Sequence, residues 1–208
     1  MSIHKKILAC IAFGLVAIPV TASAAPLTVL KVDPDKINCV FSPACSVTPA
    51  DTMGVFPADH GFTGPVRMQS RTYVGAAKSK AAGKTAYIYR IDMTHAVRGK
   101  EMHCADSMDI DFGPVEKLPY GAKGEIGDVF VINAGPNTSV GIKKASQSKN
   151  NVSIEFESPI CPANGGYPGL TSFFFGLASA KAPVAGIAKV YLTFGGGESK
   201  VPDRQPAH

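Results

Sequence analysis

Short apolar segments separated by turn-forming residues are the feature that most restricts what this chain can fold into. The sequence holds 21 glycines and 16 prolines. Gly, Pro and Asn favour tight turns, and they cluster at residues 133–137 and 164–169. No long segment repeats apolar residues at helical spacing between capping residues. The sequence therefore predicts many short strands and no long helix.

Alternation of apolar and polar residues identifies the strands. In residues 151–157, Val152, Ile154 and Phe156 are apolar and the residues between them are polar, which is typical of a strand with one wet face. Residues 85–92 are rich in β-branched and aromatic side chains. Further strands are expected over 27–32, 66–74, 102–112, 128–133, 140–145, 171–177 and 186–194. Residues 48–64 and 75–83 have no such pattern and are expected to be loops.

Many short strands without intervening helices indicate an all-β fold, a single antiparallel β-sandwich domain with immunoglobulin-like or jelly-roll architecture. A true immunoglobulin domain packs a core Trp against its disulfide. This chain has no Trp, so only the architecture of that class can apply. Strands and helices do not alternate, which argues against a parallel sheet.

The first residues have the layout of a secretory signal peptide. Two lysines precede an apolar run over residues 7–18, and Ala22 and Ala24 form a small-residue cleavage site. The apolar run is shorter than the roughly 20 residues that a membrane-spanning helix needs. We therefore expect residues 1–24 to be removed, and the mature protein to be secreted or periplasmic.

The rest of the chain divides into a predicted β-sandwich domain over residues 25–197 and a polar C-terminal tail over residues 198–208. Removal of the two signal lysines would lower the formal net charge from +5 to +3. That moderate charge favours neither nucleic acid nor another strongly anionic partner. No later segment is apolar enough to span a membrane.

Four cysteines remain after the expected cleavage, an even number that favours disulfides in an exported chain. Of the three possible pairings we expect Cys39–Cys45, because Ser42 and Pro43 allow the short loop between them to turn back. Cys104–Cys161 then follows. A metal site is less favoured, because the sequence contains no C-x-x-C pair.

Residues 171–177 carry three consecutive phenylalanines. Phe173, Phe175 and Leu177 would face one side of a strand and Phe174 the other. A central strand buried on both sides is the main interpretation. The alternative is an exposed aromatic stripe that binds a ligand or a partner.

Three aspartates, Asp106, Asp109 and Asp111, could bind Ca²⁺, because carboxylate oxygens are its preferred ligands. Their spacing does not match an EF-hand loop, so a solvated strand edge is the main alternative. Apart from this possible structural Ca²⁺, the sequence predicts no cofactor.

The sequence contains no recognisable catalytic motif. Residues 83–85 end like a phosphate-binding loop, but Lys78 stands where that motif needs Gly. A G-x-S-x-G nucleophile motif is absent. His95 and His103 could form an acid–base pair or a metal site with nearby aspartates such as Asp106, although no motif holds them together.

The leading functional hypothesis is a non-enzymatic, exported protein with a binding or interaction role. Its partner would be a glycan, an envelope protein or a second copy of the chain. Tyr120 and Tyr167 lie in Gly- and Pro-rich segments and are the candidate ligand-binding residues. The alternatives are a secreted hydrolase or metal-dependent enzyme using His95 and His103, and a self-assembling envelope or surface subunit that pairs through an edge strand.

Overall fold

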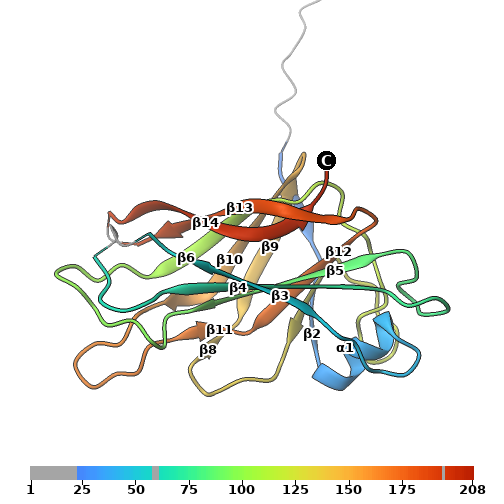
Figure 1. The fold of residues 1–208 in the computed structure, drawn as a ribbon, viewed down its shortest axis with the longest axis horizontal. Helices are drawn as coiled ribbons and strands as arrows, with labels where there is room; N and C mark the ends of the chain where they lie inside the picture. The colour runs from blue at the N-terminus through green and yellow to red at the C-terminus, as the bar shows by residue number, and fades with distance from the viewer. Residues whose placement is uncertain (1–22, 58–60, 194) are drawn as a thin grey trace, which may run out of the picture.

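The computed structural model describes residues 23–57, 61–193 and 195–208. Two β-sheets pack face to face in these residues (Figure 1), which confirms the predicted all-β sandwich. Nearly all of the predicted signal peptide, residues 1–22, lies outside the described part of the chain. Ser23 and Ala24 are exposed and precede the first strand.

The smaller sheet has six strands, and all its neighbours are antiparallel. In spatial order they are β1 (Ala25–Leu27), β9 (Ile142–Ser148), β10 (Asn151–Ile160), β6 (Ala105–Asp111), β13 (Pro183–Leu192) and β14 (Gly197–Pro206).

The larger sheet has eight strands. Its main part runs in the spatial order β2 (Val29–Val32), β7 (Val129–Ile132), β12 (Phe174–Ser179), β5 (Thr85–Asp92), β4 (Arg67–Val74) and β3 (Ala50–Val55). At one end of β5 the sheet continues into β11 (Thr171–Ser172) and β8 (Ser139–Val140). The pairs β2–β7 and β8–β11 are parallel, whereas the other neighbours are antiparallel.

The main core lies between the sheets and is built by the alternation that the sequence shows. Val152 and Ile154 on β10 are fully buried there, as are Tyr87 and Tyr89 on β5. Phe175 on the central strand β12 belongs to the same cluster, so its predicted burial is confirmed. Such apolar burial supplies most of the stabilisation of a sandwich.

A second apolar cluster covers part of the outer face of the larger sheet. The helix α1 (Pro34–Phe41), the one helix in the described residues, contributes side chains to this cluster (Figure 1). Asp33 occupies the N-cap position and Pro34 follows at the start of the helix, where a missing N–H costs nothing. Phe41 from this helix packs against Phe130 on β7.

Both predicted disulfides are confirmed. Cys39–Cys45 closes the turn that follows α1. Cys104–Cys161 joins the residue before β6 to the residue after β10, so it connects two neighbouring strands of the smaller sheet.

Two predictions about segments are wrong. Residues 50–55, expected within a loop, form edge strand β3, and four of its six residues are exposed. Residues 197–206, expected mostly as a polar tail, form β14, which pairs with β13 along its whole length. Ser199 and Asp203 face the interior of the sandwich, so hydrophobic alternation could not reveal this strand.

The N-terminal strand passes from one sheet to the other. β1 pairs with β9 in the smaller sheet, and after Thr28 the chain continues as β2 in the larger sheet. The crossing is fixed because the Thr28 main-chain N–H donates to the Asp128 carboxylate at 2.8 Å.

Candidate ligand-binding site

The outer face of the larger sheet carries a row of polar side chains beyond the area covered by α1. Tyr89 lies opposite Phe175 on β12, and these two face the core. Because side chains alternate along a strand, the residues next to Tyr89 and Phe175 in the sequence face outward. Arg90 lies opposite Gln69 on β4 and beside Phe174 on β12. Strand register thus brings residues of the consecutive strands β4 and β5 together with the distant strand β12.

Two arginines contact the ring of Phe174. The guanidinium carbons of Arg71 and Arg90 each lie 4.5 Å from the ring centroid. At this distance a guanidinium group is attracted by the ring electrons, which contributes about 0.5–2 kcal/mol depending on solvent exposure. Phe174 is half-buried, so the prediction that both faces of this strand are buried holds only in part. The two guanidinium groups cover part of the Phe174 ring.

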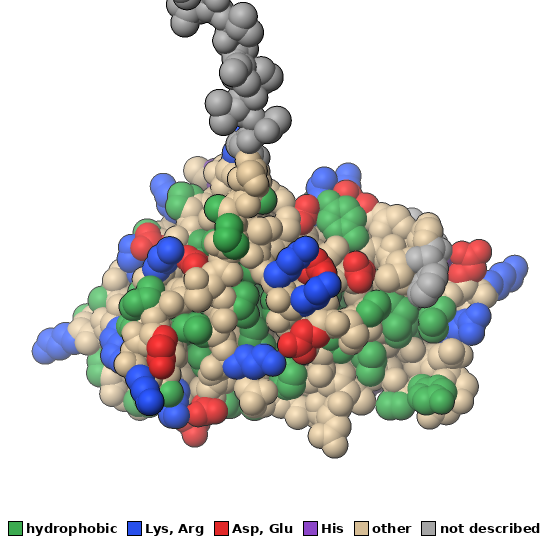
Figure 2. Space-filling view, turned by 180° about the vertical axis from the view of Figure 1, so that it is seen from behind, with side chains coloured by type: hydrophobic (Ala, Val, Ile, Leu, Met, Phe, Trp, Pro, Cys, Tyr) green, Lys and Arg blue, Asp and Glu red, His purple; other side chains and the backbone are tan. Residues whose placement is uncertain are grey.

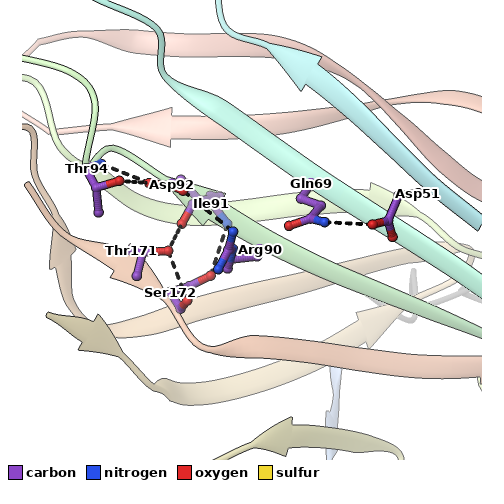
Figure 3. Close-up of polar contacts among 8 residues, drawn as sticks. All are labelled: Asp51, Gln69, Arg90, Ile91, Asp92, Thr94, Thr171 and Ser172. Carbon is purple, nitrogen blue, oxygen red and sulfur yellow. Dashed lines mark hydrogen bonds and ion pairs between the residues drawn. The ribbon is translucent and has the colours of Figure 1, made fainter. Parts of the chain in front are cut away.

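Carboxylates hold both arginines in place. Nε of Arg71 lies 2.9 Å from an Asp51 oxygen, and the other Asp51 oxygen accepts a hydrogen bond of 3.1 Å from the Gln69 amide. Arg90 lies 3.6 Å from the Asp92 carboxylate. Figure 3 shows the contact of Gln69 with Asp51, between β4 and β3, and that of Arg90 with Asp92 on β5. Each arginine is therefore oriented by one carboxylate.

Asp92 is itself fixed by the turn that follows β5. The main-chain N–H and the hydroxyl of Thr94 donate to its carboxylate at 2.9 and 2.6 Å. Burial alone would raise the pKa of Asp92, but the Thr94 hydrogen bonds and the Arg90 charge lower it overall. The carboxylate that orients Arg90 is consequently ionised at neutral pH.

Two hydroxyl groups bind the end of β5, where its neighbour changes from β12 to β11. The Ser172 hydroxyl accepts from the Ile91 main-chain N–H at 3.0 Å, and the Thr171 hydroxyl donates to the Ile91 carbonyl at 2.8 Å (Figure 3). These side chains replace strand-to-strand hydrogen bonds at the irregularity. They connect β11 to β5 at the residue that follows Arg90.

A pocket of about 250 Å³ opens between α1 and this face of the sheet. We call it the Arg71 pocket; it is lined by Asn38, Val47, Pro49, Arg71, Tyr73, Ile88, Ile132 and Phe174. Asn38 comes from α1, while Val47 and Pro49 come from the segment after the Cys39–Cys45 disulfide. The short disulfide thus shapes one wall, and the sheet forms the other.

Tyr73, whose side chain contributes to the lining of the Arg71 pocket, has an unused hydrogen-bond donor. Its side chain is only 7% exposed, and its hydroxyl has no hydrogen-bond partner among the described residues. Burial raises the pKa of Tyr73 well above its ordinary value despite the nearby Arg71 charge, so the hydroxyl keeps its proton. A guanidinium, a phenol and an amide beside apolar side chains can hold the anionic group of a small ligand and its apolar body.

The three predicted calcium ligands do not form a site. Asp109 accepts a hydrogen bond of 3.0 Å from Tyr191, and Asp111 lies 3.2 Å from His208. Asp106 is exposed, next to an irregularity in the pairing of β6 with β10. Within residues 23–57, 61–193 and 195–208, no group of three His, Cys, Asp or Glu side chains could hold a metal ion.

The two histidines contact different partners. His103 is buried, and its ring lies 3.2 Å from the Thr193 carbonyl oxygen and 3.5 Å from the Glu101 carboxylate. His95 is exposed, and its charge acts on Asp92. The contacts found in the described residues join neither histidine to Asp106, so the enzyme alternative gains no support from this arrangement.

The two predicted ligand-binding tyrosines differ in their surroundings. Tyr120 is 1% exposed, and its ring packs 4.9 Å from that of Phe130 in the second apolar cluster. Tyr120 is therefore a core residue, although it also contributes to the lining of a hollow of about 220 Å³. Tyr167 is 78% exposed at the other end of the sandwich, where it remains available for binding.

Sequence reasoning missed the arginines. Arg67, Gln69 and Arg71 follow each other at every second position of β4, and that period was the available signal for a polar outer face. Arg90 and Phe174 join them only through strand register, which no local pattern reveals.

The two disulfides suggest an oxidising, extracytoplasmic environment. In the described residues, no helix is both long and apolar enough to cross a membrane. Comparison with models of protein families, with curated protein sequences and with solved structures gave no match.

Proposed function

We propose that this protein is exported after cleavage of residues 1–24 and works outside the cytoplasm as a binding protein. Its ligand, in this proposal, is a small carboxylate with an apolar body, held in the Arg71 pocket. The signal-like N-terminal sequence and the two disulfides support the location. We assign a carboxylate as the ligand because Arg71 lies near Tyr73, whose hydroxyl has no hydrogen-bond partner among the described residues.

The chemistry favours a carboxylate over a neutral ligand. Arg71 uses Nε for its ion pair with Asp51, which leaves the terminal nitrogens of the guanidinium group for a second acceptor. A buried donor without a partner costs free energy, and a ligand oxygen that accepts from Tyr73 removes that cost. Phe174 and Ile88 offer apolar surface to the body of the ligand.

Calorimetric titration of the protein from residue 25 onward with benzoate, benzamide and inorganic phosphate tests this proposal. We expect benzoate to bind, and neutral benzamide, which has the same shape, to bind at least tenfold more weakly. Binding of phosphate but not benzoate would move the proposal to another anion class and overturn it. Equal affinity for benzoate and benzamide would also overturn it.

Three variants locate the binding. Arg71→Gln should weaken benzoate binding at least tenfold, which corresponds to about 1.4 kcal/mol. Tyr73→Phe removes only the hydroxyl and should weaken binding severalfold with the ring still in place. The matched control is Arg67→Gln, on the same strand but outside the pocket lining; it should bind benzoate as the parent protein does.

A further inference from the structure

Two hollows meet at Met102 at one end of the sandwich, and neither shares a lining residue with the Arg71 pocket. One, of about 310 Å³, is lined by Met102, Cys161, Pro162, Asn164, Tyr167, Pro168 and Leu170. The other, of about 380 Å³, is lined by Arg98, Lys100, Glu101 and Met102. We call the two together the end groove. It belongs to the loops at the left in Figure 1.

The two walls of the end groove are fixed to each other. The Cys104–Cys161 disulfide joins the loop before β6 to the loop after β10. Val97 pairs with Ala163 in an isolated bridge, and the Arg98 main-chain N–H donates to the Ala163 carbonyl at 2.9 Å. The groove is therefore formed before any partner arrives, and binding requires little ordering of the protein.

Tyr167 stands on a tight two-residue turn at the edge of the groove. Asn164 and Tyr167 exchange two main-chain hydrogen bonds, of 3.0 and 2.9 Å. Gly165 and Gly166 between them have φ angles of 54° and 95°, which suit a type I′ turn and favour glycine. The turn holds an exposed aromatic ring in a fixed position, and such rings are frequent anchors in protein interfaces.

The two halves of the end groove differ in chemistry. Around Tyr167 the lining is mostly apolar, with Pro162, Pro168 and Leu170. Beyond Met102, the described lining has two exposed cations, Arg98 and Lys100, and one carboxylate, Glu101, which lies 3.5 Å from His103. In Figure 2, which shows the molecule from behind, hydrophobic and basic side chains lie near each other at the right-hand end.

We infer that the end groove docks an extended acidic segment of another protein, in which an apolar side chain lies next to Asp or Glu residues. The apolar side chain would occupy the half beside Tyr167, where flexible Met102 adapts to its shape. The acidic side chains would meet Arg98 and Lys100. This inference is independent of the carboxylate proposed for the Arg71 pocket, because the two sites share no residue.

Fluorescence anisotropy with three labelled hexapeptides tests this inference on the protein from residue 25 onward. One peptide has a central Leu-Phe pair between two pairs of Glu, the second replaces every Glu with Gln, and the third replaces Leu-Phe with Ser-Ser. We expect the first to bind at least fivefold more tightly than either of the others, and added salt to weaken it. Equal binding of the Glu and Gln peptides would overturn the inference, and so would no binding of the first.

Variants of exposed residues keep the fold and locate the contact. Tyr167→Ser and the double variant Arg98→Gln, Lys100→Gln should each weaken binding of the first peptide at least fivefold. Lys123→Gln is the control, because Lys123 is an exposed lysine outside both sites. This variant should bind the peptide as the parent protein does. Unchanged binding in the double variant would overturn the acidic-segment assignment even if Tyr167 matters.

Discussion

The hydroxyl of Tyr89, on strand β5 of the larger sheet, donates a hydrogen bond of 2.8 Å to the main-chain carbonyl of Arg204, on edge strand β14 of the smaller sheet. Tyr89 is fully buried, so this bond ties the two layers together inside the core. Tyr87 makes a parallel contact with the Lys181 carbonyl, also at 2.8 Å.

Tyr89→Phe should lower the free energy of unfolding by about 1–2 kcal/mol, because the variant leaves the Arg204 carbonyl without its donor. Urea unfolding followed by fluorescence or circular dichroism measures the change. Tyr191→Phe is the control, since its bond to Asp109 lies on a less buried face and its loss should cost less. An equal or larger loss in the control would contradict the role given to the Tyr89 bond.

Asp203 should make stability depend on pH. Its side chain is 2% exposed, and neither carboxylate oxygen has a partner in the described residues. Burial raises its pKa from 3.8 to about 7. Between these values the folded protein holds a proton that the unfolded chain has released, so the free energy of unfolding falls as pH rises, by up to about 4 kcal/mol.

Asp203→Asn tests this pH dependence, because the amide has nearly the same shape and does not titrate. Unfolding by urea at pH 4, 5.5, 7 and 8 should show a smaller fall with pH in the variant. The variant should gain most over the parent at pH 8. If both proteins lose stability equally between pH 4 and 8, Asp203 is not the titrating group.

The two disulfides should contribute different amounts to the stability of the folded protein. In a chain-entropy description, closing the loop between Cys104 and Cys161, which are 57 residues apart, contributes about 4 kcal/mol, against about 2 kcal/mol for Cys39 and Cys45, 6 apart. Replacing each pair with Ala and comparing the thermal midpoints measures the difference. A larger loss from the Cys39–Cys45 variant would contradict this order.

Gly54→Ala should separate β3 from β14. A Cβ at position 54 would lie 2.1 Å from the Pro202 carbonyl oxygen, so the strands must move apart at a cost of about 1–3 kcal/mol. Met53→Ser, on the exposed side of the same strand, is the control and should change stability by less than about 0.5 kcal/mol. Equal unfolding midpoints for the two variants would show that β3 can shift freely.

Sequence patterns predicted the elements whose alternation follows burial. β5 and the start of β10 lie where the sequence placed them, and the 75–83 loop connects β4 to β5 as expected. The sequence patterns did not predict β3 and β14, because Asp203 and Ser199 face inward while Met53 and Val55 face solvent. Their positions depend on contacts between the two sheets, which a local pattern cannot report.

The candidate site was less predictable than the fold. Tyr120 looked like a loop aromatic, but its segment folds back over α1 and its ring becomes core. The cluster at Phe174 joins the consecutive strands β4 and β5 to β12, which is distant from them in the sequence. A polar residue at every second position marks a wet face, but it does not say which charges meet there.

The crossing of the N-terminal strand at Thr28 imposes an order on folding. Val29 pairs with Val129, and Leu27 pairs with Ala145, so the first strand finds its neighbours only after most of the chain has been made. Pairings this distant in sequence close slowly. The early segment therefore lacks its sheet partners until the strands at Val129 and Ala145 are present, and its docking belongs to the late steps of folding.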